Sequence, residues 1–169
     1  GLGDVYKRQI LRHHNRLALC GMEHSEIFTQ LLGAAQNRPL NEEELGLINS
    51  NPQGLAGLIG LRYTHISEDE IRSEVEVVPD HHQPWGVANG GLYCTITEST
   101  ASVGSLIVAG KPVVGVNNNT DFLKPVADGN VTAVATPLYK GRRTQLWEVK
   151  ISQGDVLLAA STLRTMTVQ

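Results

Sequence analysis

The segment 89–110 constrains the fold of this chain more than any other stretch, because Glu98 is the only charged residue in it. Small residues alternate with leucine, isoleucine and valine, so no face of a helix built from this segment is strongly polar. Asn89 is a good N-cap, and Gly110 followed by a lysine and a proline is a typical helix end. We therefore expect one helix of about five turns, enclosed by the rest of the protein.

The first turn of this helix and its single carboxylate are candidate functional features. Gly90 and Gly91 cost helix propensity, roughly 1 kcal/mol each relative to alanine, which suggests that another group approaches the backbone there. The free N–H groups of a helix N-terminus attract anions and developing oxyanions. A carboxylate in an apolar helix is paired, protonated or used in chemistry. Glu98 is therefore either a functional group or the partner of a buried arginine such as Arg62 or Arg164.

The composition excludes several classes of function. A net charge of −3 without any lysine- or arginine-rich run argues against nucleic acid as a partner. No apolar run approaches the ~18 residues of a membrane span, and no signal-peptide pattern is present, so we expect a cytoplasmic protein that binds no membrane. Cys20 and Cys94 lie far apart, which argues against a disulfide framework or a zinc site. Adjacent histidines such as His13-His14 and His81-His82 point apart, and no Cys, Asp or Glu lies at ligand spacing from them, so we interpret them as solvated loop residues.

The chain divides into three parts. Residues 1–21 have no clear period and differ in character from the segment that Met22 opens, so we interpret them as a non-native extension or a disordered arm. Residues 22–51 contain two expected helices, one over 23–36 and one that begins at Asn41 with acidic residues in its first turn. Residues 52–169 form the main domain, in which the pattern changes to strands.

The main domain alternates with a period of two on both sides of the helix. Strands are expected over 55–65, 71–78, 112–122, 131–138, 144–151 and 156–167, with a loop over 80–86 and a hairpin turn over 153–155. Two strands before one long helix and four strands after it predict an α+β fold, in which an antiparallel sheet of six strands wraps around the helix.

Four motifs of this domain resemble a known family. They are the loop and helix start over 82–91, Glu98, the strand 119–125, and the run from Lys140 to Arg143. Together they resemble the hotdog-fold acyl-CoA thioesterases of the phenylacetate-degradation and 4-hydroxybenzoyl-CoA type, over roughly residues 54–168. The resemblance implies the hotdog fold and hydrolysis of an acyl- or aryl-CoA thioester to a carboxylic acid and free coenzyme A. Coenzyme A is then part of the substrate, and no cofactor is expected.

The resemblance also implies four catalytic positions. Glu98 corresponds to the acidic residue that attacks the thioester or activates water, and Gly90 to the glycine whose N–H polarises the thioester carbonyl. Gln83 corresponds to a polar residue that helps to place the nucleophile or the acyl group. Asn89 stands where the family most often has a histidine, and it retains capping and hydrogen-bonding capacity.

Five further residues are predicted to bind the substrate. Ser102 lies one turn after Glu98, beside the expected carboxylate, and His82 and Gly91 lie at the expected entrance and at the helix start. Arg142 and Arg143 match the region that commonly meets the phosphates of coenzyme A, which arginine binds in a bidentate manner. Without the resemblance, these two arginines would be interpreted as a solvated turn.

The spacing of the two main catalytic positions predicts an assembly. Gly90 and Glu98 are eight residues apart, which is about 12 Å along a helix, so one thioester carbon cannot easily contact both. A site between two antiparallel copies, with Gly90 from one chain and Glu98 from the other, resolves this difficulty and predicts an obligate homodimer. The resemblance implies that such dimers pair into tetramers.

Two other functions remain open at this stage. A binding or regulatory module with the same fold but no turnover would explain why Asn89 replaces histidine. A dehydratase or hydratase on the same fold is less well supported, because no convincing pair of aspartate and histidine lies on the expected loop.

Overall fold

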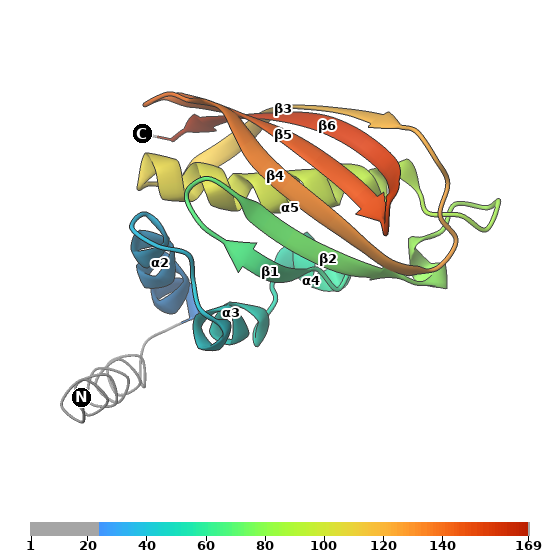
Figure 1. The fold of residues 1–169 in the computed structure, drawn as a ribbon, viewed down its shortest axis with the longest axis horizontal. Coiled ribbons are helices and arrows are strands. Elements are labelled where there is room, and N and C mark those ends of the chain that lie inside the picture. Colours follow the sequence, from blue (N-terminus) through green and yellow to red (C-terminus); the bar gives the residue numbers. More distant parts are fainter. Residues whose placement is uncertain (1–23, 169) are drawn as a thin grey trace.

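A computed structural model describes residues 24–168 and shows a long helix, α5, lying across one antiparallel sheet (Figure 1). The elements are α2 (His24–Ala35), α3 (Glu42–Asn49), α4 (Gly54–Leu58), β1 (Arg62–Ile66), β2 (Ile71–Val77), the 3₁₀ turn η1 (Pro79–His81), α5 (Gly90–Ala109), β3 (Val113–Phe122), β4 (Gly129–Lys140), β5 (Thr144–Gln153) and β6 (Val156–Thr167). The six strands lie in the order β1-β2-β4-β5-β6-β3. The α+β fold predicted from the sequence is confirmed.

Helix α5 begins and ends where its capping residues predict. The Asn89 side chain accepts a hydrogen bond of 2.8 Å from the Gly91 N–H, and Gly110 adopts the left-handed conformation with φ of 62°. The expectation of a fully enclosed helix is wrong, however, because one side of α5 faces outward. Glu98 and Gly91 are exposed on that side, whereas Ile96 and Ile107 are buried under the sheet.

The core lies between α5 and the inner face of the sheet. On β5, the alternating residues Gln145, Trp147, Val149 and Ile151 are fully buried, as their period of two predicts. The Trp147 indole packs directly against Gly104 of α5, where a β-carbon would overlap the ring. Glycine at this position therefore allows a close approach between the helix and β5.

We expect Gly104→Ala to destabilise the protein by about 1–3 kcal/mol, because the added methyl group must displace a fully buried indole. Urea unfolding followed by circular dichroism measures this loss. Gly33→Ala is the control, since a β-carbon at Gly33 in α2 meets no atom within 4 Å. An unfolding free energy equal to that of the wild type would contradict the tight packing described.

The N-terminal helices pack outside the sheet, on the side of β1 (Figure 1). Helix α3 begins with a capping box, in which Asn41 and Glu44 each accept a hydrogen bond from the other residue's backbone N–H. Arg38 donates two hydrogen bonds to the Glu44 carboxylate, at 2.7 and 2.5 Å. These bonds from Arg38 are the main reason that the pKa of Glu44 lies below its ordinary value, although burial opposes them.

The lowered pKa of Glu44 predicts a pH dependence of stability. A carboxylate with a depressed folded-state pKa stabilises the protein above its ordinary pKa of 4.5, and this contribution is lost as the pH falls through the folded value. We expect Glu44→Gln to lower the unfolding free energy by about 1 kcal/mol at pH 7, with the difference from wild type shrinking below pH 4.5. Urea titrations across this range, with Glu42→Gln as the control, measure it. If the difference in unfolding free energy between Glu44→Gln and wild type does not change with pH, the lowered pKa of Glu44 is contradicted.

One strand prediction is wrong at its start. Residues 55–61 were expected to be extended, but 54–58 form the short helix α4 and β1 begins only at Arg62. Gly54 and Gly60 have φ values of 60° and 68°, so the backbone turns at both ends of this segment. The remaining predicted strands and the hairpin turn at Gly154 are confirmed within a few residues.

Some sequence-based predictions lie outside the described residues. These are the interpretation of residues 1–21 and the remarks on His13-His14 and Cys20. Within residues 24–168, no helix is long and apolar enough to cross a membrane.

Candidate active site

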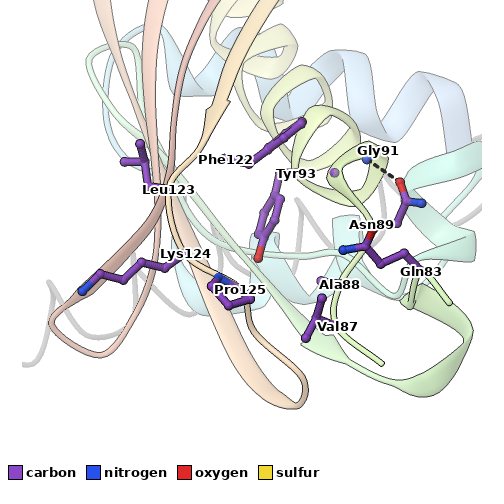
Figure 2. A pocket seen from close by; sticks show the side chains of 11 residues that line it. Gln83, Val87, Ala88, Asn89, Gly91, Tyr93, Phe122, Leu123, Lys124 and Pro125 are labelled. Atoms are coloured by element: carbon purple, nitrogen blue, oxygen red, sulfur yellow. Dashed lines mark hydrogen bonds between the residues drawn. The ribbon is translucent and has the colours of Figure 1, made fainter. Parts of the chain in front are cut away.

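A cavity of about 460 Å³ lies at the N-terminus of α5. Two chain segments line it, namely the loop and helix start over 83–93 and the segment 122–125, which begins with the last residue of β3 (Figure 2). Its lining residues are Gln83, Val87, Ala88, Asn89, Gly90, Gly91, Tyr93, Phe122, Leu123, Lys124 and Pro125. The cavity therefore contains four of the predicted site residues, Gln83, Asn89, Gly90 and Gly91.

Hydrogen bonds hold the two walls of the cavity together. The Ala88 N–H donates to the Val126 carbonyl at 2.8 Å and so joins the helix start to the segment after β3. Within the loop, the Asn89 N–H donates to the His81 carbonyl at 2.9 Å. His82 adds a second link between the two segments, since its ring Nε2 lies 2.7 Å from the Ala127 carbonyl and therefore donates to it. His82 does not line the cavity, so in this chain it holds the loop in place.

The first residue of α5 lines the cavity and has a free amide. Asn89 accepts from the Gly91 N–H, but the N–H of Gly90 donates to no atom within residues 24–168. A β-carbon at Gly90 would lie 2.6 Å from the nearest atom of the Phe122 ring, so glycine is needed for the ring to cover this turn. The Gly90 N–H is therefore available to a ligand beside an aromatic wall.

Tyr93 is a further polar group of the cavity, and no sequence motif singled it out. Its ring lies 5.9 Å from the Phe122 ring, and its hydroxyl points toward the space beside Pro125 (Figure 2). The hydroxyl is buried and has no hydrogen-bond partner among the residues described. Burial raises the pKa of Tyr93, so at neutral pH the phenol is protonated and can donate a hydrogen bond.

Glu98 lies outside this cavity. It is two turns farther along α5, on the outward side, and within residues 24–168 it forms no ion pair. The alternative of a buried pair with Arg62 or Arg164 is therefore wrong. Ser102 is half-buried one turn beyond Glu98.

Buried hydrogen bonds from residues beside Glu98 fix the rotation of α5 about its own axis. Thr97 donates to the Ser161 hydroxyl at 2.9 Å, and the hydroxyls of Thr100 and Ser73 lie 2.6 Å apart. All four of these side chains are buried. These bonds attach α5 to β6 and β2, so the backbone that carries Glu98 is fixed on the sheet side while its side chain remains exposed.

Arg142 and Arg143 lie at the other end of the molecule. They are exposed in the turn between β4 and β5, and the Arg143 carbonyl accepts from the Thr167 N–H at the end of β6. The neighbouring Val168 N–H donates to the Pro112 carbonyl, just after α5 ends. Both arginines are therefore near the C-terminus of α5, whereas the cavity of the same chain is at its N-terminus.

Comparisons with known proteins identify the family. A family model described as the Thioesterase superfamily matches residues 86–160. A protein of Mycobacterium tuberculosis named "Putative esterase Rv1847" is 38% identical over 117 aligned positions, and the alignment covers 66% of this chain and 84% of the relative. The chain belongs to the Thioesterase superfamily. The subgroup that the sequence motifs suggest stays a prediction.

Two solved structures are similar to this chain in fold. The crystal structure of thioesterase HI1161 from Haemophilus influenzae matches with a TM-score of 0.70 and 30% identity, over 80% of this chain and 95% of that one. The crystal structure of AziG from S. sahachiroi matches with a TM-score of 0.67 and 32% identity, over 70% and 99% of the two chains. The hotdog fold predicted for this member of the superfamily is confirmed.

Sequence reasoning assigned no role to one wall of the cavity. Phe122, Leu123, Lys124 and Pro125 belong to a strand motif that carried the resemblance, yet no function followed from their residue types. The sequence contains this motif and the helix-start motif together, and both line the same cavity. Their joint presence could have predicted that these four residues belong to the site.

Proposed function

We propose that this protein is an acyl-CoA thioesterase that hydrolyses an acyl- or aryl-CoA thioester to a carboxylic acid and free coenzyme A. Membership of the Thioesterase superfamily supports thioester hydrolysis in general. The observation that carries the proposal is the free Gly90 N–H beside an aromatic-walled cavity. A backbone donor of this kind is suited to the oxyanion of a tetrahedral intermediate.

The proposed reaction uses Glu98 as nucleophile or general base. As a base, Glu98 takes a proton from water, whose oxygen attacks the thioester carbon while the carbonyl oxygen becomes an oxyanion bound by the Gly90 N–H. Collapse of this intermediate breaks the C–S bond, and the departing thiolate of coenzyme A takes up the proton. Gln83 orients the acyl group or the attacking group from the cavity wall. Asn89 shapes the helix start through its bond to Gly91.

The proposed active unit is a homodimer. Among the described residues that line the Gly90 cavity there is no carboxylate, and Glu98 is exposed farther along the same helix. Strand β3 is an edge of the sheet and exposes the apolar side chains of Val114, Val116 and Phe122. A second, antiparallel copy that covers this edge brings its Glu98 to the Gly90 cavity. Two such dimers form the proposed tetramer.

The same arrangement gives the two arginines a role. In an antiparallel pair, the C-terminal end of one α5 lies near the N-terminal end of the other. Arg142 and Arg143 of one copy then approach the cavity of its partner, where they bind the phosphates of coenzyme A. Ser102 lies beside Glu98 on the outward side of the helix, where it contacts the bound thioester.

Thiol release from a panel of aromatic and aliphatic acyl-CoA thioesters tests the function. Turnover of at least one thioester, at a rate well above its spontaneous hydrolysis, is the expected result. The alternative is a binding module without turnover, which the use of Asn89 as a helix cap in the position of the family histidine favours. Binding of coenzyme A esters without hydrolysis of any of them would establish that alternative. A monomer that hydrolyses acyl-CoA at full rate would refute the shared site.

A further inference from the structure

Strand β3 runs alongside α5 in the opposite direction and contacts it at three levels. At one end, the Phe122 ring covers Gly90. In the middle, the Asn118 side-chain amide donates to the Cys94 carbonyl at 2.9 Å. At the other end, Gly115 lies against the side chain of Glu98. One strand therefore contacts both residues of α5 that the proposed reaction uses.

The contact between Gly115 and Glu98 depends on the missing side chain. A β-carbon at Gly115 would lie 2.7 Å from Oε1 of Glu98 and 3.3 Å from its carboxyl carbon. Gly115 is not among the glycines with positive φ, so its backbone conformation is open to other residues. The reason for glycine here is therefore space, and that space is occupied by the Glu98 carboxylate.

A β-bulge brings Gly115 to this position. The pairing of β3 with β6 shifts between Gly115 and Asn117, which face Thr165 and Arg164. In a regular strand, residues 115 and 118 would point to opposite faces. The extra residue, Val116, changes the alternation, so that both Gly115 and Asn118 face α5.

The helix itself has little freedom to respond to a change at Gly115. The buried bonds of Thr97 and Thr100 to the sheet fix the backbone on both sides of Glu98. A group added at Gly115 therefore moves the Glu98 side chain about its own torsions, and the carboxylate is the part that shifts.

We propose that Gly115, placed by the bulge at Val116, is a positioning residue that sets the orientation of the Glu98 carboxylate. This inference rests on the proposed role of Glu98 in thioester hydrolysis. Gly115 touches no substrate. It allows one oxygen of the carboxylate to lie against β3, in the orientation from which the carboxylate attacks the thioester or deprotonates water in the neighbouring cavity of the dimer.

Gly115→Ala tests the proposal. The colliding atoms are the flexible end of an exposed side chain, so the variant is expected to fold with an unchanged thermal midpoint. We expect kcat to fall by about 10- to 100-fold with KM within about twofold of wild type, because a misplaced carboxylate affects the chemical step. Gly46→Ala is the matched control, since a β-carbon there meets no atom within 4 Å. An unchanged kcat in a folded Gly115→Ala variant overturns the proposal.

Two double variants separate positioning from a general structural effect. In the Glu98→Gln background, Gly115→Ala is expected to change the residual rate by less than about twofold, because no carboxylate remains to be placed. In the Glu98→Asp background, the shorter side chain clears the added methyl group, so the same substitution costs less than it does beside Glu98. If Gly115→Ala lowers kcat by the same factor in the wild-type, Glu98→Gln and Glu98→Asp backgrounds, the proposal is overturned.

An NMR measurement without substrate tests the positioning role of Gly115 separately from the proposed thioesterase function. The ¹³Cδ resonance of Glu98, assigned by its absence in Glu98→Gln, is expected to shift in Gly115→Ala and to stay in place in Gly46→Ala. If the wild type hydrolyses no thioester, the proposed function fails and this resonance alone decides whether Gly115 places the carboxylate. A resonance that Gly115→Ala leaves unmoved overturns the inference even where the thioesterase activity is present.

Discussion

Glu98→Gln is expected to abolish most of the thioesterase turnover. The amide keeps the shape of the side chain and its contact with Gly115 but can neither accept a proton from water nor act as a carboxylate nucleophile. Loss of a general base typically costs about 10²–10⁴ in rate, so kcat for the best thioester is expected to fall by that factor. Thiol release under saturating substrate measures it.

The same variant is expected to fold as the wild type does. Glu98 is exposed, and within the described part of the chain it forms no ion pair, so its charge contributes little to stability. Glu76→Gln, on the exposed side of β2, is the matched control for removing one surface carboxylate and should retain full activity. Full activity in Glu98→Gln would refute any catalytic role for this residue.

Single turnover in ¹⁸O-labelled water tests the nucleophilic role of Glu98. If Glu98 attacks the thioester carbon, an anhydride forms, and water that opens it at the enzyme's carbonyl leaves ¹⁸O in the Glu98 side chain. Water that opens it at the substrate's carbonyl labels the carboxylic acid product alone, as the general-base route also does. Mass spectrometric detection of ¹⁸O in the peptide that contains Glu98 therefore establishes the nucleophilic role.

The sequence predicts the central helix well because its two ends are marked by local chemistry. The side-chain bond of Asn89 to the helix start and the left-handed conformation of Gly110 depend only on neighbouring residues. Alternation predicts β2 and β5 for the same reason, since each has one buried face. The start of β1 was predicted too early, because the run of small and apolar residues over 54–61 fits a strand as well as a short helix. The positive φ values of Gly54 and Gly60 are not visible in that run.

The site was harder to predict than the fold, because tertiary contacts decide it. Hydrophobic pattern alone places Glu98 in a buried helix, whereas hydroxyl pairs such as Thr97 with Ser161 turn the small polar residues toward the sheet and leave Glu98 outside. Tyr93 and Phe122 line one cavity from segments 29 positions apart, so no local motif joins them. Gly115 was missed although a glycine inside a strand commonly marks a bulge or a close approach.

Two inactive variants are expected to restore activity when their subunits mix. Gly90→Val should lower kcat by about 10²–10³, because the side chain collides with the Phe122 ring and displaces the amide that receives the oxyanion. Glu98→Gln is inactive for a different reason, since it retains the Gly90 amide and lacks only the carboxylate. Each variant therefore keeps the half of the site that the other has lost.

Co-expression of the two variants distinguishes a shared site from a site within one chain. If Gly90 of one copy works with Glu98 of the other, every mixed dimer has one fully intact site and one doubly altered site. With equal amounts of both chains, half of the dimers are mixed, and the expected activity is about a quarter of the wild-type value. A site built within a single chain predicts no recovery, because every chain then carries a defect in its own site. Activity that stays at the level of the separate variants would therefore refute the antiparallel shared site while leaving the role of Glu98 intact.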